Sequence, residues 1–425
     1  MKVKYIVLVL ALASVFSACS RDEENLFDKS AAERAQAALD NAIDILTAPA
    51  NGWEMIYFAN PDSRGYNLLV TFDKNGKVTA TAKNSLTTGN VIKSDSSTWE
   101  VINDYGPILT FNTYNEVLHA WADPRSDGDG YLGDYEFLIL HADANYVKLK
   151  GKKHSAYYYL YPLETGVTAA QYFSEVEAMD KRLFGNGNLL HVQANNEEYM
   201  LYDGASGIFM LAGLGETPNT EEPESYPVAA MRNGIQFMNS PRALGDTRYT
   251  IKGDKMESSS SSIFAVPAIA YFTEYIRFAL GSWKIDIKNI NDVTKDLIAK
   301  TDEALKASYS GNKKKASVQG LRYKLYEGNI VVIFSYIGSG TKANDIMYSF
   351  DVATEGNAIK VAYKGPANEA AQNVLTAFPV VADLLSSLNG NLVFNTTDAL
   401  NPSNGGQLID HNNSAIWFNI TGAVE

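Results

Sequence analysis

The residues best suited to chemistry gather in one loop, "WADPRSDGDGYLGDYEF", at residues 121–137. A twelve-residue calcium loop takes acidic ligands at its third, fifth and twelfth positions. With the first position at residue 125, these places are held by Asp127, Asp129 and Glu136. The first position itself is Arg125, whose cation cannot ligate calcium. The loop is therefore either a calcium site built on these three acids or a solvated acidic turn between two strands.

Three aromatic residues, Trp121, Tyr131 and Tyr135, flank the same acids. Aromatic rings beside carboxylates bind sugars, because a ring stacks on the apolar face of the sugar while acids and amides bind its hydroxyls. Tryptophan and tyrosine in strands are more often core residues, and we assign Trp53 and Trp99 to the core on that ground. The three loop aromatics are predicted to contact a ligand, with core packing as the alternative.

Other catalytic signatures are missing from the sequence. The five histidines are dispersed, and there is no His-Glu-x-x-His helix, nucleophile elbow, phosphate-binding loop or dinucleotide fingerprint. The two carboxylates of a glycosidase lie apart in sequence and meet only in the fold, so no pair can be chosen among 49 acidic residues. The sequence predicts no cofactor besides calcium and favours binding over catalysis. A surface hydrolase or peptidase with a site between two domains is the first alternative, and a structural adhesin or assembly component is the second.

The only cysteine of the chain, Cys19, follows a short apolar segment. Residues 1–18 have two lysines, an apolar run and two small residues, which is the layout of a secretory signal, and the run is shorter than the ~20 residues that span a bilayer. "FSAC" resembles the lipobox of bacterial lipoproteins, with Phe16 in place of the usual leucine. The resemblance implies a lipid anchor on Cys19, and ordinary cleavage beside an unmodified cysteine is the alternative.

The residues after this cysteine form an acidic tether at 19–29. "SRDEEN" resembles the surface-export signal of Bacteroidota lipoproteins, which implies a position on the outer face of the outer membrane. A solvated linker is the plain alternative. The formal net charge of −13 argues against a nucleic-acid partner, because nucleic-acid binding needs a basic surface.

The first folded segment is predicted at residues 30–163. Ser30 and Glu33 are spaced as a helix capping box, and nine short apolar runs separated by turn residues follow. A meander with so many strands closes most simply into a barrel, because exposed strand edges invite aggregation. The order of its features resembles a lipocalin-like barrel, whose interior is either filled by side chains or holds a small ligand. We expect the filled form.

A lysine and tyrosine segment, "YVKLKGKKHSAYYYLYP", ends this domain at residues 146–162. Strand alternation places Lys148 and Lys150 on the outer face, with Val147 and Leu149 inside. The plain interpretation is a charged strand face that hinders edge pairing. Contact with an anion is the alternative, which the overall negative charge of the chain disfavours.

The second segment is predicted at residues 164–425. Thr168 and Gln171 are spaced as a helix capping box, and β-hairpins then alternate with helices near 267–280, 291–308 and 367–388, the last bent at Pro379. We considered a further division at the serine-rich residues 257–262. The predicted fold class is α+β and mostly antiparallel β, with an N-terminal helix and lipocalin-like barrel followed by a C-terminal α+β domain.

Several sequence blocks occur in an order similar to that of large, uncharacterised surface lipoproteins of Bacteroidota: "CSRDEENLFDKSAAER", "APANGWEMIYF", "GYNLLVTFDKNGKVT", "ADPRSDGDG" with "GDYEF", and "YVKLKGKKHSAYYYLYPL". The resemblance implies association with SusC/SusD-like uptake systems, in which a TonB-dependent transporter works with a SusD-like lipoprotein. It implies no reaction and no catalytic residue. We therefore predict an outer-membrane, lipid-anchored binding protein for a glycan or peptide nutrient.

Overall fold

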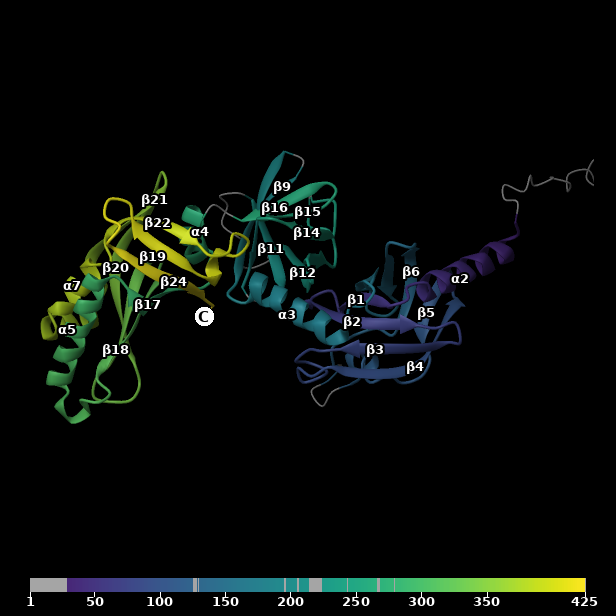
Figure 1. Ribbon diagram of the computed structural model, residues 1–425, viewed down its shortest axis with the longest axis horizontal. Helices are drawn as coiled ribbons and strands as arrows, with labels where there is room; N and C mark the ends of the chain where they lie inside the picture. Colours follow the sequence, from purple (N-terminus) through teal and green to yellow (C-terminus); the bar gives the residue numbers. More distant parts are fainter. Residues whose placement is uncertain are drawn as a thin grey trace, which may run out of the picture.

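The strands form three closed barrels, each of eight antiparallel strands. The computed structural model describes residues 29–424, except 125–127, 129, 195, 205, 214–223, 243, 266–267 and 279. The signal segment, Cys19 and most of the tether lie outside the described residues. Figure 1 shows barrel 1 in purple and blue, barrel 2 in teal, and barrel 3 in green and yellow, arranged in a row.

Barrel 1 follows helix α2 (Ala31–Thr47), which begins at the predicted capping box. Ser30 Oγ accepts a hydrogen bond from the Glu33 amide at 3.2 Å, and Glu33 Oε2 accepts one from the Ser30 amide at 2.8 Å. β1 pairs with both β2 and β8 and so closes the barrel. Its strands are β1 (Trp53–Phe58), β2 (Gly65–Phe72), β3 (Lys77–Ala82), β4 (Lys93–Asn103), β5 (Pro107–Phe111), β6 (Glu136–Ala142), β7 (Val147–Gly151) and β8 (Tyr157–Pro162).

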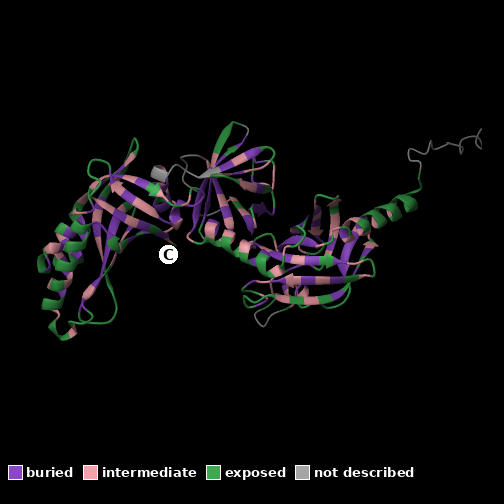
Figure 2. Ribbon diagram, in the orientation of Figure 1, coloured by how far each residue is buried: buried purple, intermediate pink, exposed green. Residues whose placement is uncertain are grey.

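The interior of barrel 1 is filled by apolar and aromatic side chains. Alternate residues of β1 and β8, including Trp53, Tyr57 and Tyr158, point inward and are fully buried. The rings of Tyr57 and Tyr158 meet edge to face with centroids 4.8 Å apart, a favourable arrangement for aromatic pairs. The predicted core positions of Trp53 and Trp99 are confirmed. Figure 2 shows buried residues concentrated on the strands and exposed ones along α2.

Barrel 2 follows helix α3 (Ala169–Phe184). Thr168 Oγ1 accepts from the Gln171 amide at 3.2 Å, so the predicted N-cap is confirmed. The predicted capping box is not completed, because the Gln171 side chain donates to Glu175 one turn further on. α3 packs against β12 of barrel 2 and β2 of barrel 1. The barrel is closed by β9 and β16 and consists of β9 (Asn188–Ala194), β10 (Glu197–Asp203), β11 (Ile208–Gly213), β12 (Glu224–Met231), β13 (Gly234–Phe237), β14 (Arg248–Lys252), β15 (Lys255–Glu257) and β16 (Ser261–Ala265).

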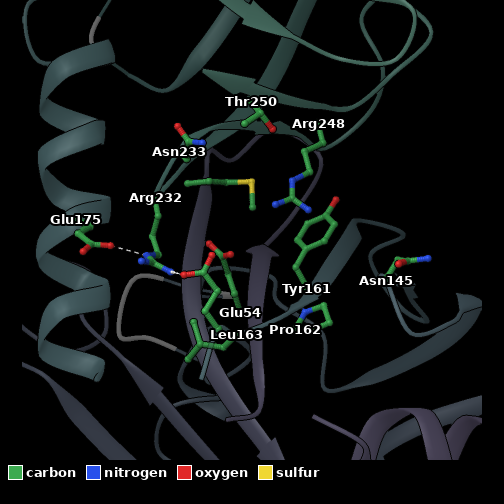
Figure 3. A pocket seen from close by; sticks show the side chains of 12 residues that line it. Glu54, Asn145, Tyr161, Pro162, Leu163, Glu175, Arg232, Asn233, Arg248 and Thr250 are labelled. Atoms are coloured by element: carbon green, nitrogen blue, oxygen red, sulfur yellow. Dashed lines mark hydrogen bonds and ion pairs between the residues drawn. The ribbon is translucent and has the colours of Figure 1, made fainter. Parts of the chain in front are cut away.

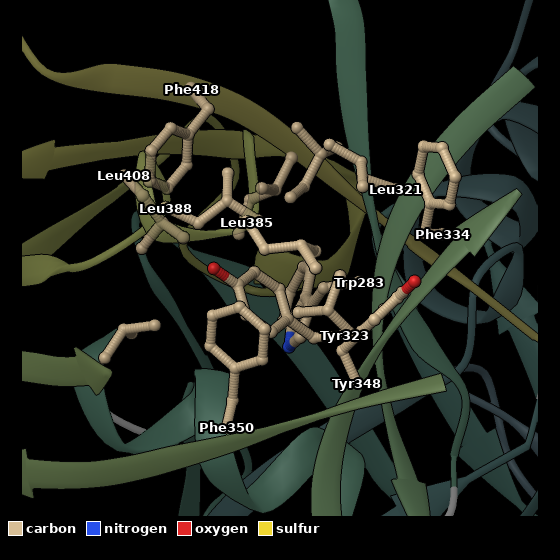
Figure 4. Close-up of a cluster of buried hydrophobic side chains, with 14 of the residues drawn as sticks. Trp283, Leu321, Tyr323, Phe334, Tyr348, Phe350, Leu385, Leu388, Leu408 and Phe418 are labelled. Atoms are coloured by element: carbon tan, nitrogen blue, oxygen red, sulfur yellow. The ribbon is translucent and has the colours of Figure 1, made fainter. Parts of the chain in front are cut away.

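Barrel 3 follows helix α4 (Ala268–Arg277) and contains three further helices, α5 (Asp292–Ser308), α6 (Glu369–Ala377) and α7 (Val380–Ser386). Figure 4 shows Leu385 and Leu388 beside Leu408 and Phe418, so the α7 segment packs against the barrel core. α6 and α7 meet at Pro379, as predicted. The strands are β17 (Ser282–Ile290), β18 (Ser317–Tyr326), β19 (Asn329–Ile337), β20 (Asn344–Glu355), β21 (Ala358–Pro366), β22 (Gly390–Thr396), β23 (Gly406–Asp410) and β24 (Trp417–Ala423).

Barrels 1 and 3 are joined to their preceding helices by the same contact. The indole nitrogen of Trp53 donates to the carbonyl of Leu46 in α2, and that of Trp283 donates to the carbonyl of Phe272 in α4, both at 2.8 Å. Each bond satisfies a buried indole N–H. Leu46 lies in the last turn of α2, so its bond also satisfies a carbonyl that has no partner within the helix. A tryptophan at the start of the first strand of barrel 1 and of barrel 3 therefore holds the helix that precedes that barrel.

Closure of the C-terminal strands differs from the sequence prediction. The antiparallel and mostly β character is confirmed, but residues 164–425 contain two closed barrels where we expected one α+β domain. The serine-rich residues 257–262 form the hairpin between β15 and β16 inside barrel 2, and the chain passes to barrel 3 at α4. Closure depends on pairing between first and last strands, which local patterns do not reveal.

Candidate functional site

Trp121, the centre of the predicted ligand contact, is a core residue. Its side chain is fully buried at the end of barrel 1, stacked on Tyr57 at 5.2 Å between ring centroids and next to Tyr66 at 4.8 Å. A Cβ atom on Gly133 would lie 2.5 Å from Trp121 Cβ, so only glycine allows this close approach. No face of the indole is available for a sugar, and the core alternative describes this residue.

The other two loop aromatics have different surroundings. Tyr131 is half-buried, packs against the Trp121 ring, and donates from its hydroxyl to the carbonyl of Leu86 at 3.2 Å. Tyr135 is 45% exposed and stacks on His119 with 5.0 Å between centroids. Of the three predicted contacts, Tyr135 alone has a largely open ring, and it lies on the outside of the barrel.

The predicted calcium site falls mostly outside the described residues. Asp127 and Asp129 lie outside them. Glu136, the expected twelfth ligand, is the first residue of β6, and its Oε2 lies 3.5 Å from Lys152 Nζ. No group of three or more His, Cys, Asp or Glu side chains in the described part of the chain is arranged to hold a metal.

A second candidate site lies where barrel 1 contacts barrel 2. The outer face of β8 carries Tyr159 and Tyr161, whose alternation with inward Tyr158 follows from the strand geometry. Tyr159 donates from its hydroxyl to the carbonyl of Met238 at 2.8 Å, and Tyr161 donates to Gln236 Oε1 at 2.7 Å. Both acceptors belong to the β13 region, so these two tyrosines tie the barrels together.

A buried polar chain continues this interface on the side of α3. Glu54, on the outer face of β1, accepts a hydrogen bond from the Tyr172 hydroxyl at 2.6 Å. Asn67 donates to that same hydroxyl and to the carbonyl of Ala230, both at 3.1 Å. Glu54 is only 7% exposed, and burial raises the pKa of its carboxyl above the ordinary value because the charged form loses hydration. The hydrogen bond from Tyr172 opposes that rise in pKa only in part.

Two cavities open at this interface and share three lining residues, Asn145, Tyr161 and Arg248; together we call them the inter-barrel groove. The first, the Glu54 cavity, has a volume of about 310 Å³. Figure 3 shows Arg232 beside Glu175 and Glu54 in this cavity, with Arg248 lying against Tyr161. Arg232 forms ion pairs with Glu164 and Glu175, so its charge is matched.

The second, the Lys148 cavity, has a volume of about 480 Å³. Its aromatic lining includes Tyr146, a half-buried ring that stacks on His141 with 4.4 Å between centroids. Lys148 Nζ lies 4.6 Å from the ring centre of Tyr157, and burial lowers the pKa of this lysine. The other lining residues are Asn145, Tyr159, Tyr161, Gly245, Asp246, Thr247, Arg248 and Ser259.

Arg248 lies where the two cavities meet. It is directly opposite Gln236 in the β13–β14 pair, and its guanidinium carbon is 3.8 Å from the ring centre of Tyr161. This stacking leaves the N–H groups at the edge of the guanidinium free to point outward. The side chain is exposed and, within the described residues, makes no ion pair.

The one carboxylate of the Lys148 cavity, Asp246, is held by the neighbouring serine turn. Its Oδ2 accepts from Ser259 Oγ at 2.9 Å, from Ser260 Oγ at 2.8 Å and from the Ser260 amide at 3.1 Å. Burial acts to raise the pKa of Asp246, but these hydrogen bonds outweigh it and the pKa is lowered. Asp246 is therefore a charged, fixed acceptor.

The groove has the chemistry of a carbohydrate site. Barrel 1 contributes the aromatic ring of Tyr146 and the amide of Asn145. Barrel 2 contributes the hydroxyl of Thr247, the carboxylate of Asp246 as a fixed hydrogen-bond acceptor, and the guanidinium of Arg248 as a donor of paired hydrogen bonds. The lysine and tyrosine segment at 146–162, for which an anion contact was an alternative, supplies Tyr146, Lys148, Tyr159 and Tyr161 to the lining of the Lys148 cavity. The residues from barrel 2 gave no sequence signal, because they join the site only when the barrels dock.

These features define a protein of three consecutive eight-stranded barrels with a polar, aromatic groove between the first two. A family model described as "Domain of unknown function (DUF4302)" matches residues 23–250, which is more than half of the chain. The chain therefore belongs to this family. The match includes barrel 1, α3 and barrel 2 as far as β14, and so every groove residue except Ser259. No match was found among curated proteins. In the described part of the chain, no helix has the length and apolar character needed to cross a bilayer.

Proposed function

We propose that this protein is a non-catalytic, glycan-binding lipoprotein on the outer face of the outer membrane, and that the inter-barrel groove is its binding site. The observation that carries the proposal is the convergence of Tyr146 from barrel 1 with Arg248 and Asp246 from barrel 2 around a cavity of about 480 Å³. A volume of this size suits a few sugar units. A peptide nutrient is the other ligand class that such a groove admits.

The lipid anchor and the membrane location extend this proposal. They are supported by the lipobox-like "FSAC" and by the acidic tether that resembles Bacteroidota export signals. A partnership with a SusC/SusD-like uptake system is proposed on the sequence resemblance alone. Each barrel is lipocalin-like in having eight strands, but the filled interior of barrel 1 directs the ligand to the groove outside the barrels.

The binding site is tested by two matched substitutions. We expect Tyr146→Ala, in the chain of residues 25–425 that includes every described element, to weaken binding of the tightest glycan from an oligosaccharide and peptide panel at least tenfold. Tyr135→Ala removes a more exposed tyrosine ring, near the acidic loop, and should change the affinity less than threefold. Loss of binding only in Tyr135→Ala would move the site to that loop. If calorimetry detects no binding of any glycan in the panel, the glycan proposal is refuted. Binding of a peptide would then identify the protein as a peptide-binding protein.

The anchor is tested independently of the ligand. Cells fed a clickable palmitate analogue should label the full-length protein, and Cys19→Ala should abolish the label. External protease should degrade the labelled protein in intact cells while leaving a periplasmic control protein whole. Labelling of Cys19→Ala, or full protection from protease, would contradict the anchor or the surface location respectively.

A hydrolase is the second candidate, because Glu54 is a buried carboxyl with a raised pKa in the same groove. Such a group can act as a general acid near neutral pH. Incubation of the bound glycan with the protein, followed by chromatography, distinguishes the two functions. Unchanged glycan supports binding alone, whereas products that disappear in Glu54→Gln without loss of affinity would establish catalysis.

A further inference from the structure

The arginines of this acidic protein differ in how their charge is matched. The chain has a formal net charge of −13. Six described arginines form ion pairs with carboxylates: Arg64, Arg182, Arg232, Arg242, Arg277 and Arg322. Arg248, in the inter-barrel groove, forms none with any described carboxylate. Arg248 interacts electrostatically with Glu54 across the Glu54 cavity but contacts no described carboxylate, so its guanidinium N–H groups are available for a ligand.

The surroundings of Arg248 hold it in a fixed orientation. Its guanidinium stacks on Tyr161, and that ring is itself fixed by the hydrogen bond from its hydroxyl to Gln236. Gln236 is fully buried and lies opposite Arg248 in the β13–β14 pair. A guanidinium fixed in this way loses little conformational freedom on binding, and its paired N–H groups match a carboxylate or a sulfate.

A second cation lies in the same cavity. Lys148 is held over the rings of Tyr157 and Tyr159, at 4.6 and 5.5 Å from their centres, and makes no ion pair with a described carboxylate. Asp246 is the only acidic residue lining the Lys148 cavity in the described structure, and the serine turn already occupies its Oδ2. Among the described residues, the lining of the Lys148 cavity therefore has two cations that form no ion pair and one carboxylate, Asp246, whose Oδ2 already accepts hydrogen bonds.

We propose that the groove selects an anionic glycan, with Arg248 binding its acid group and Lys148 adding a second positive charge. The proposal rests on the proposed glycan-binding function and adds the ligand class. A carboxylate of a uronic acid and a sulfate ester both have the planar or tripodal oxygens that a guanidinium binds. Tyr146, which lies between His141 and Tyr161, would contact the adjoining sugar with the part of its ring that these two neighbours leave uncovered. The amide of Asn145 would bind the hydroxyls of that sugar.

The test compares three tetrasaccharides by calorimetry: oligogalacturonate, the same oligomer as its neutral methyl ester, and a sulfated galactan. We expect the wild-type protein to bind one of the two acids at least tenfold more tightly than the ester, and the tighter acid identifies the anionic group. Arg248→Gln should weaken acid binding tenfold or more and change ester binding less than threefold. Arg248→Lys should cause an intermediate loss of affinity for the acid, because lysine keeps the positive charge but lacks the paired N–H donors of a guanidinium.

Arg242→Gln is the matched control. It removes the same charge from barrel 2 at an exposed residue outside the groove, and should leave all three affinities within twofold. Equal binding of acid and ester, or an equal loss of both in Arg248→Gln, would overturn the anionic selectivity while leaving the proposed function intact. Absence of binding by all three would also overturn it, and the wider glycan panel would then decide the proposed function separately.

Discussion

The guanidinium carbon of Arg248 lies 3.8 Å from the ring centre of Tyr161, although one residue belongs to barrel 2 and the other to barrel 1. The ring is fixed from its other end by Gln236 of barrel 2. The same tyrosine therefore joins the two barrels and orients the arginine of the groove. The groove is therefore complete only when barrels 1 and 2 are docked against each other.

The two roles of Tyr161 can be separated by substitution. Tyr161→Phe leaves Gln236 Oε1 without its donor and should cost about 1–3 kcal/mol of unfolding free energy, with affinity for the anionic ligand changed less than threefold. Tyr161→Leu also removes the ring under Arg248 and should lower that affinity tenfold. Urea unfolding and calorimetry measure the two effects. Equal affinities in the two variants would show that the ring does not position Arg248.

Glu54 should make the folded protein less stable as pH rises, whereas an ion-paired acid makes it more stable as pH rises. Its pKa is raised in the folded state, so above the unfolded value of 4.5 the folded protein holds a proton that the unfolded chain has lost. Stability from this group is present at low pH and is lost as pH rises through the folded pKa.

Glu54→Gln removes this dependence while keeping the shape of the side chain. The unfolding free energy of the variant minus that of the wild type should therefore increase between pH 4 and pH 8, as measured by urea unfolding at each pH. All other titrating groups are shared and cancel in the difference. A difference that is constant or decreases with pH would contradict the buried position of this carboxyl.

Trp121 should prove to be a stability residue. Trp121→Ala removes a fully buried ring stacked on Tyr57 and should lower the unfolding free energy by about 3–5 kcal/mol. Tyr135→Ala, the exposed neighbour, should stay within about 0.5 kcal/mol of the wild type. Circular dichroism during urea unfolding measures both. If Trp121→Ala is as stable as the wild type but binds the glycan more weakly, Trp121 contacts the ligand, as the sequence predicted.

Asn401 joins barrel 3 to the end of α3. Its amide nitrogen donates to the carbonyls of Arg182, Leu183 and Gly187 at 3.0–3.1 Å, and the residue is fully buried. Asn401→Ala should cost about 1–3 kcal/mol, because buried carbonyls lose their donor. Asn401→Asp should cost more, since it places an acceptor against acceptors. Asn412→Ala, exposed in the same barrel, is the control, and an equal effect of Asn412→Ala and Asn401→Ala would refute this role.

Local features of the sequence predicted local structure well. Ser30 and Thr168 begin helices where their spacing indicated, Pro379 separates two helices, and Trp53 and Trp99 are buried. Each of these depends on residues a few positions apart or on the two-residue period of a strand. Local sequence left the acidic loop undecided, because Trp121 beside an Asp-Pro turn has the same local sequence whether its ring faces solvent or the core.

The sequence by itself determined the helices, the run of short antiparallel strands and the lysine and tyrosine segment that supplies the barrel 1 side of the Lys148 cavity. The tertiary structure alone decided that β9 closes on β16 and β17 on β24, and that Arg248 meets Tyr161. The physical reason is that periodicity records which face of an element is buried, whereas closure and docking depend on shape and hydrogen bonding between segments far apart in the chain.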